Sequence, residues 1–130
     1  MSGSPDELRG GRSLSTRSTG DWGEDLALRY LTERGYKLVV RNYRTRYGEL
    51  DLVMRSGDTL VFVEVKLRHG REFGDPIEAV TYRKQAAVRS MAEQYLAERE
   101  PDFEDLRFDV VGILASRNEP PKIQHIQDAF

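Results

Sequence analysis

Four residues of this chain have the side chains needed for metal-dependent chemistry on a phosphate ester. Asp51 precedes Glu64 by thirteen positions, and Lys66 follows Glu64 by two. Carboxylate oxygens suit hard cations such as Mg²⁺ or Mn²⁺, and a nearby lysine can offset the charge that develops on a phosphate during hydrolysis. Glu24, earlier in the chain, could supply a further metal ligand. These residue types point to hydrolysis of phosphodiester bonds.

The strands that must position these side chains form a predicted hairpin. Alternating residue types predict strands at Glu49–Arg55 and Thr59–Leu67, joined by a short turn at residues 56–58. If the turn is centred between residues 57 and 58, Asp51 lies opposite Glu64. Two carboxylates facing each other at about 5 Å between Cβ atoms repel unless something positive lies between them. The predicted register therefore favours a metal site.

The charged face of this hairpin also has a purely structural explanation. One charged face is ordinary in an antiparallel sheet, and the same register places Glu49 opposite Lys66. We expect Glu49 to form an ion pair with Lys66 or Arg68 rather than to bind metal. The other face is expected to be apolar and to pack on a core, and it would carry Leu50, Leu52, Met54, Val61, Val63, Val65 and Leu67.

The hairpin belongs to a chain in which helices and strands alternate. Helices are predicted from Thr19 to a stop at Gly35, and over about Ile77–Arg99. The order of elements is α-β-β-β-α-β-β, and a strand, a long helix and another strand in succession predict an α/β fold with a mixed sheet. The other predicted strands are Tyr36–Arg44, Arg107–Leu114 and Ile123–Gln127.

Composition bounds the domain organisation. Residues 1–18, rich in Ser, Gly and Arg, are expected to be a flexible N-terminal tail, because they hold too few apolar side chains to offset the entropy of ordering. Residues 19–130 are the size of a single domain. The absence of cysteine excludes a Cys-based zinc site and a thiol nucleophile, and it fits the cytoplasm. No apolar run approaches the roughly 20 residues that span a bilayer, so no membrane association is expected.

Positive charge is concentrated in the part of the chain that carries the candidate site. Residues 1–89 hold 16 Lys and Arg against 13 Asp and Glu, whereas residues 90–130 hold 4 against 9. In the basic part, cations and tyrosines are interleaved between residues 34 and 47, as on a surface that follows phosphates. A solvated strand edge explains this run equally well. The residues expected to contact nucleic acid are Arg41, Arg44, Arg46, Arg68 and Lys84.

Four further residues carry expectations of their own. Asp109 shares a predicted strand face with apolar residues, so we expect it to be a structural hydrogen-bonding group. His125 has no partner at a metal-ligand spacing, and we expect it to contact solvent or the backbone. Tyr43 and Tyr47 are the candidates for stacking on bases.

The central residues resemble a known nuclease signature. Asp51, the thirteen-residue interval and Glu64-Val65-Lys66 within the apolar run 60–67 resemble the PD-(D/E)XK pattern, with Leu50 where that pattern has proline. More specifically, the chain resembles the bacterial YraN family over about residues 20–130, whose Gly-Glu-x-Asp version of the pattern it shares. The resembling segments are Gly23-Glu24 with Ala27 and Tyr30-Leu31, Gly35-Tyr36, Arg41-Asn42, residues 48–52, residues 62–66 with Arg68, residues 107–111 and Ala129-Phe130.

This resemblance implies a fold, a chemistry and a set of ligands. The implied fold is restriction-endonuclease-like, a three-layer α/β/α arrangement with a central mixed sheet, similar to archaeal Holliday-junction resolvases. It implies that Glu24, Asp51 and Glu64 bind Mg²⁺ or Mn²⁺ and that Lys66 is the catalytic lysine of a nuclease acting on DNA rather than RNA, branched or flap structures included. A binding or protein-interaction module without cleavage is the alternative. A homodimer would suit cutting two strands.

Overall fold

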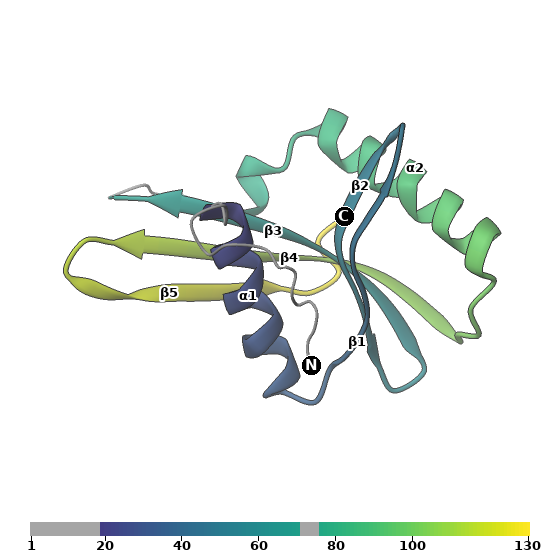
Figure 1. The fold of residues 1–130 in the computed structure, drawn as a ribbon, viewed down its shortest axis with the longest axis horizontal. Coiled ribbons are helices and arrows are strands. Elements are labelled where there is room, and N and C mark those ends of the chain that lie inside the picture. The colour runs from purple at the N-terminus through teal and green to yellow at the C-terminus, as the bar shows by residue number, and fades with distance from the viewer. Residues whose placement is uncertain (1–18, 71–75) are drawn as a thin grey trace, which may run out of the picture.

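The computed structural model describes residues 19–70 and 76–130 (Figure 1). The predicted tail over residues 1–18 lies outside the described part of the chain. The succession of helices and strands agrees with the predicted one. The elements are α1 (Thr19–Thr32), β1 (Lys37–Thr45), β2 (Gly48–Ser56), β3 (Thr59–His69), the 3₁₀ helix η2 (Pro76–Ala79), α2 (Tyr82–Arg99), β4 (Asp105–Ser116) and β5 (Glu119–Ile126).

The second predicted helix is divided into two elements. The expected span of Ile77–Arg99 is occupied by η2 and then α2, with Val80 and Thr81 between them. Thr81 caps α2, because its side-chain oxygen accepts a hydrogen bond from the backbone N–H of Lys84 at 3.1 Å. The long helix therefore begins at Tyr82 rather than near Ile77.

The strands form one open, mixed sheet. Its order is β1-β2-β3-β4-β5, so each strand lies beside its neighbour in sequence (Figure 1). β3 and β4 are parallel and pair from Thr59 with Asp105 to His69 with Ala115, while the other pairs are antiparallel. α2 makes the crossover between the parallel strands, as a parallel connection requires. This confirms the mixed sheet predicted from the sequence.

One helix packs on each face of this sheet. Ala27 and Leu31 of α1 are buried against one face, and Val88, Met91 and Tyr95 of α2 are buried against the other. The sheet side chains in the α1 cluster are Leu52, Met54, Val61, Val63, Val111 and Ile113. Those in the α2 cluster include Tyr43, Leu50, Val53, Leu60 and Phe62. The sheet is thus an apolar layer between two helices.

The β1–β2 hairpin changes face partway along its length. Alternation predicts that Leu50 shares a face with Leu52, but Leu50 lies in the α2 cluster and Leu52 in the α1 cluster. The two strands remain paired across this point, with Tyr43 opposite Leu50, and Asn42 has a left-handed φ of 57°. The prediction for Leu50 was wrong because alternation holds only for a regular strand. Asp51 therefore lies where the hairpin bends toward α2.

A buried polar network joins β4, β5 and Tyr36, the residue just before β1. The Asp109 side chain is fully buried and accepts hydrogen bonds from Arg107 Nε at 2.9 Å and from the Asp128 backbone N–H at 2.9 Å. His125 Nε2 lies 2.7 Å from Asp109 Oδ2, and Arg107 also donates to the Tyr36 hydroxyl at 2.7 Å. The structural role expected of Asp109 is confirmed. The expectation for His125 was wrong, since its partner is a carboxylate.

Within the described ranges, no helix combines the length and the apolar character needed to cross a membrane.

Candidate metal centre

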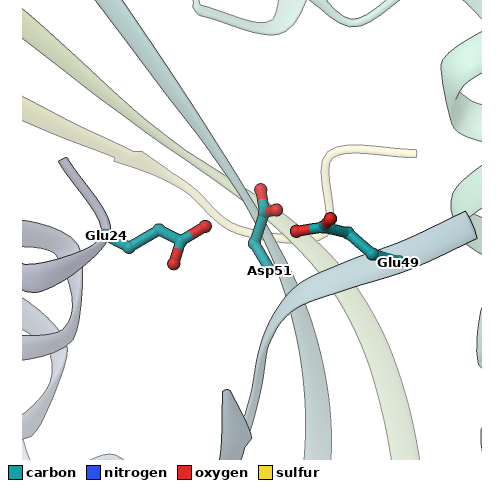
Figure 2. A group of neighbouring side chains, drawn as sticks. All are labelled: Glu24, Glu49 and Asp51. Carbon is teal, nitrogen blue, oxygen red and sulfur yellow. The ribbon is translucent and has the colours of Figure 1, made fainter. Parts of the chain in front are cut away.

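Three carboxylates converge beside the bend in β2. Glu24 comes from α1, while Glu49 and Asp51 come from β2, and one oxygen of each lies within 4.8 Å of the others. Figure 2 shows the three side chains pointing toward a common space. Glu49 and Asp51 are two positions apart on the same strand, and Glu24 faces them from the helix. The fold thus brings Glu24 next to two acids that come 25 and 27 positions later in the sequence.

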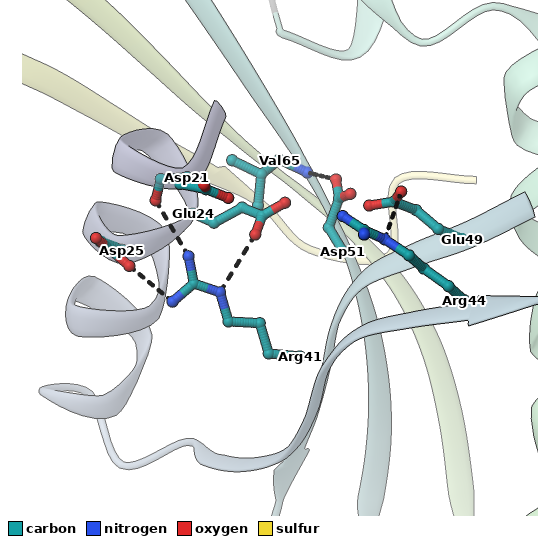
Figure 3. Close-up of polar contacts among 8 residues, drawn as sticks. All are labelled: Asp21, Glu24, Asp25, Arg41, Arg44, Glu49, Asp51 and Val65. Carbon is teal, nitrogen blue, oxygen red and sulfur yellow. Dashed lines mark hydrogen bonds and ion pairs between the residues drawn. The ribbon is translucent and has the colours of Figure 1, made fainter. Parts of the chain in front are cut away.

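Asp51 is held by the neighbouring strand. The β2–β3 ladder has the register set by a turn centred between residues 57 and 58, with Val53 opposite Phe62, and it runs from Ser56 to Leu52, which pairs with Val63. It ends before the expected pairs of Asp51 with Glu64 and of Glu49 with Lys66. At that point Asp51 Oδ2 accepts a hydrogen bond from the Val65 backbone N–H at 2.9 Å (Figure 3). Past the end of the ladder, the Asp51 side chain therefore accepts the hydrogen bond of a β3 backbone N–H.

Glu64 lies next to Asp51 but is directed to the α2 side. Its side chain is 5% exposed, and Lys84 Nζ is 3.5 Å from its Oε2. Burial raises the pKa of Glu64, and the positive charges of Lys84 and Lys66 offset only part of this effect. The two lysines therefore lie close enough to act on this carboxylate electrostatically. Of the predicted ligands, Glu24 and Asp51 converge with Glu49, and Glu64 adjoins Asp51.

The carboxylates of this group are crowded and partly withdrawn from water. Burial is the main cause that raises the pKa of Asp51 to about 7, and the charge of Glu64 adds to it, despite the hydrogen bond from Val65. Burial and the charge of Asp51 likewise raise the pKa of Glu24, against the opposing effect of Arg41. A bound cation would relieve this repulsion, and an oxygen-only donor set fits Mg²⁺ or Mn²⁺.

Arg41 connects the site to α1. Its Nε donates to Glu24 Oε1 at 3.2 Å, one terminal nitrogen lies 2.7 Å from Asp25 Oδ1, and the other donates to the Asp21 carbonyl at 3.1 Å (Figure 3). The guanidinium thus spans one turn of the helix and fixes the Glu24 side chain. The contact with nucleic acid expected of Arg41 remains a prediction, and the structure adds a positioning role.

Glu49 is the member of the acidic group that sequence reasoning did not count as a ligand. Its carboxylate pairs with Arg44 on β1, with 3.2 Å between Glu49 Oε1 and Arg44 Nε (Figure 3). The expected partner was Lys66 or Arg68, and the partner found is Arg44. The signal that could have identified Glu49 is its spacing of two residues from Asp51, which places both side chains on one face of a strand.

The remaining residues expected to contact nucleic acid come from the β1–β2 hairpin, β3 and α2. Arg44 and exposed Arg46 are at the end of the β1–β2 hairpin, Arg68 is near the end of β3, and Lys84 is in the first turn of α2. Of the two stacking candidates, Tyr47 is 66% exposed. Tyr43 is buried in the α2 cluster, where its hydroxyl contacts Glu98, so the expectation that it stacks on bases was wrong.

Comparison with known proteins places these residues in a family. The model of the uncharacterised protein family UPF0102 matches residues 23–113, which include every carboxylate described above and Lys66. A UPF0102 protein of Rhodococcus opacus is 50% identical over 111 residues, covering 85% of this chain and 94% of the relative. One from Syntrophomonas wolfei is 49% identical over 114 residues, covering 88% and 98%. One from Dictyoglomus turgidum is 36% identical over 118 residues, covering 90% and 100%. The chain therefore belongs to the UPF0102 family, the family that its resemblance to YraN proteins had indicated.

Proposed function

We propose that this protein is a metal-dependent nuclease that hydrolyses phosphodiester bonds in DNA. The observation that carries the proposal is the convergence of Glu24, Glu49 and Asp51 within 4.8 Å. Glu64 adjoins Asp51, and the charge of Lys66 acts on Glu64. A fold of the restriction-endonuclease type is part of the proposal, and a mixed sheet between two helices with a bent hairpin supports it.

Mg²⁺ or Mn²⁺ is the proposed cofactor. Glu24, Asp51 and Glu64 would hold the ion, and Glu49 is positioned to add a fourth carboxylate. When bound, such an ion activates water for attack and polarises the phosphate. The raised pKa values of Asp51 and Glu24 support this assignment, because these groups gain most from a nearby positive charge.

The protein's own cations would handle the remaining charge. Lys66 lies on β3 two residues beyond Glu64, and its ammonium would offset the negative charge that grows on the phosphate. Lys84 balances Glu64 and could turn to a phosphate once that carboxylate has another positive partner. Arg41 would keep Glu24 in place while the substrate binds.

The proposal is tested by cleavage assays on four kinds of DNA. Purified protein is incubated with labelled four-way junction, flap, linear duplex and single-stranded DNA, each with Mg²⁺, Mn²⁺ or EDTA. We expect cutting that needs the metal and that falls by at least a hundredfold in Glu64→Ala. Glu119→Gln, at an exposed acid on β5, is the matched control and should cut as the wild type does. Binding without cutting on all four substrates would leave a non-catalytic DNA-binding module and refute the nuclease.

A further inference from the structure

Two tyrosine rings are unusually exposed on this protein. Tyr47 is 66% exposed in the β1–β2 turn, and Tyr82 is 88% exposed as the first residue of α2. The other large hydrophobic side chains that the structure describes as exposed are nearer 40%, and these are Trp22, Leu38, Val39 and Phe103. An exposed tyrosine ring contributes nothing to the hydrophobic core. Core packing therefore does not explain the ring at either position.

Each ring is two residues away in sequence from a charged side chain at or next to the carboxylate group. Tyr82 precedes by two residues Lys84, whose ammonium lies 3.5 Å from Glu64. Tyr47 precedes by two residues Glu49, a member of the carboxylate group.

The hairpin end that carries Tyr47 packs against the helix that carries Tyr82. Thr45 Oγ1 lies 3.5 Å from Met91 Sδ on α2, and Leu50 is buried in the α2 cluster. This packing follows from the bend in the hairpin, which turns its outer half toward α2. The hairpin end and α2 therefore lie on the same side of the sheet.

The surroundings of the rings are positively charged. The Arg46 guanidinium lies 4.9 Å from the centre of the Tyr47 ring and donates to its hydroxyl at 2.6 Å. Arg44 is exposed on β1, three residues before Tyr47. Arg83 is exposed next to Tyr82. Cations beside aromatic rings are the arrangement that binds single strands, because the cations meet phosphates and the rings stack on bases.

We infer that Tyr47 and Tyr82 stack on unpaired bases, so that the substrate is DNA with single-stranded segments at the site. In a continuous duplex each base face is covered by its neighbours, and an exposed ring finds no face to stack on without flipping a base out. Forked, flapped or single-stranded DNA presents such faces next to the strand to be cut. This inference rests on the proposed function, since the same site must hold the DNA.

The test measures binding separately from cleavage. All proteins carry Asp51→Asn and are kept in EDTA, so that no strand is cut. Fluorescence anisotropy gives the Kd for a forked DNA, a single strand and a hairpin-closed duplex without free ends. We expect Tyr47→Ala and Tyr82→Ala each to weaken binding of the fork and the single strand by on the order of tenfold, and to leave the closed duplex unchanged.

Two control variants separate stacking from other effects. Tyr82→Phe keeps the ring and should bind as the parent does. Phe103→Ala removes an exposed ring far from the site, in a pocket lined by Asp58, Asp102 and Glu104, and should change nothing. A 2-aminopurine in the single-stranded arm should be quenched on binding and should regain its fluorescence with Tyr82→Ala.

Every other outcome overturns the inference. If the tyrosine variants weaken closed duplex as much as forked DNA, the rings do not read unpaired bases. If neither variant weakens the binding of any DNA, or if the parent binds no DNA, the rings serve another partner. Failure of the proposed function is seen elsewhere, as an absence of cutting by the wild type with metal, and it leaves the binding comparison intact.

Discussion

Single residues of the site bear charges that the fold does not fully balance. Burial and the charge of Glu64 raise the pKa of Asp51 to about 7, and Glu24 is shifted in the same direction. A carboxylate whose pKa is raised in the folded state favours folding while it is protonated, and this contribution is lost as the pH rises through about 7. Without a cation, such a group of carboxylates destabilises the folded protein. A bound cation stabilises the folded protein.

Removing the charge of Asp51 should therefore stabilise the metal-free protein. In EDTA at pH 8 we expect Asp51→Asn to raise the free energy of unfolding by about 1 to 2 kcal/mol, because the amide can still accept the bond from Val65. With Mg²⁺ present the wild type should gain stability and the variant should not. Urea denaturation with and without metal checks both statements. A variant less stable than the wild type in EDTA would contradict them.

The guanidinium of Arg41 should not be replaceable by an ammonium. It makes three contacts with one turn of α1, to Glu24, Asp25 and the Asp21 carbonyl, which a lysine cannot reproduce together. We expect Arg41→Lys to weaken Mn²⁺ binding about tenfold, since Glu24 loses its fixed orientation. Isothermal titration calorimetry measures the affinity. Arg34→Lys, in the turn after α1, is the control, and full affinity in Arg41→Lys would refute the positioning role.

At the scale of elements, η2 is fixed by a close approach to the sheet. Gly112 of β4 lies opposite Lys66 in the ladder, and a Cβ placed on Gly112 would lie 2.2 Å from Pro76 Cγ. Gly23 of α1 has room, with Leu67 Cβ at 3.5 Å from the position of such an atom. We expect Gly112→Ala to lower the free energy of unfolding by about 1 to 3 kcal/mol. Gly23→Ala should leave it unchanged or raise it. Paired thermal denaturation compares them, and equal effects would contradict the contact with Pro76.

The network around Asp109 should make the stability of the fold depend on pH. Burial alone would raise the pKa of Asp109, but hydrogen bonds from His125, Arg107 and the Asp128 N–H hold it below its ordinary value. A lowered pKa stabilises the fold at pH values above the unfolded pKa of about 4, and this is lost as the pH falls through the folded pKa. Asp109→Asn should lower the free energy of unfolding by about 3 kcal/mol at pH 7, because a buried charge pair is broken.

The pH dependence provides the check on this network. In urea titrations at pH 7, 4 and 3, the difference in stability between the wild type and Asp109→Asn should narrow as the wild-type carboxylate takes up a proton. Glu119→Gln, at an exposed acid, should follow the wild type throughout. A difference that stays constant from pH 7 to pH 3 would show that the charge of Asp109 is not the stabilising feature.

At the scale of the whole molecule, local patterns predicted the elements and their order. The alternation around residues 56–58 gave the hairpin, and the register of Val53 with Phe62 followed from the centre of its turn. The mixed sheet followed from the strand, helix and strand that succeed one another. The proximity of Asp51 to Glu64 followed from that register, because the ladder remains regular up to Leu52.

What the sequence did not predict depends on non-local contacts. The left-handed Asn42 and the turn of Leu50 toward α2 have no local signal, since period-two alternation assumes a regular strand. The burial of Tyr43 follows from the same bend. The pairing of His125 with Asp109 joins two strands through tertiary packing, so spacing in the sequence could not reveal it. Glu49 was assigned to Lys66 because the ladder was assumed to continue past Leu52.

The central claim is that the carboxylates beside the bent hairpin hold a metal ion with which the protein cuts DNA. Its most direct test is the single-turnover cleavage rate of a forked DNA, measured as a function of Mg²⁺ concentration for the wild type, Asp51→Asn and Glu119→Gln. We predict saturable, Mg²⁺-dependent cutting by the wild type and Glu119→Gln, with a rate at least a hundredfold lower for Asp51→Asn. Cutting at the same rate in EDTA, or in Asp51→Asn, would contradict the account.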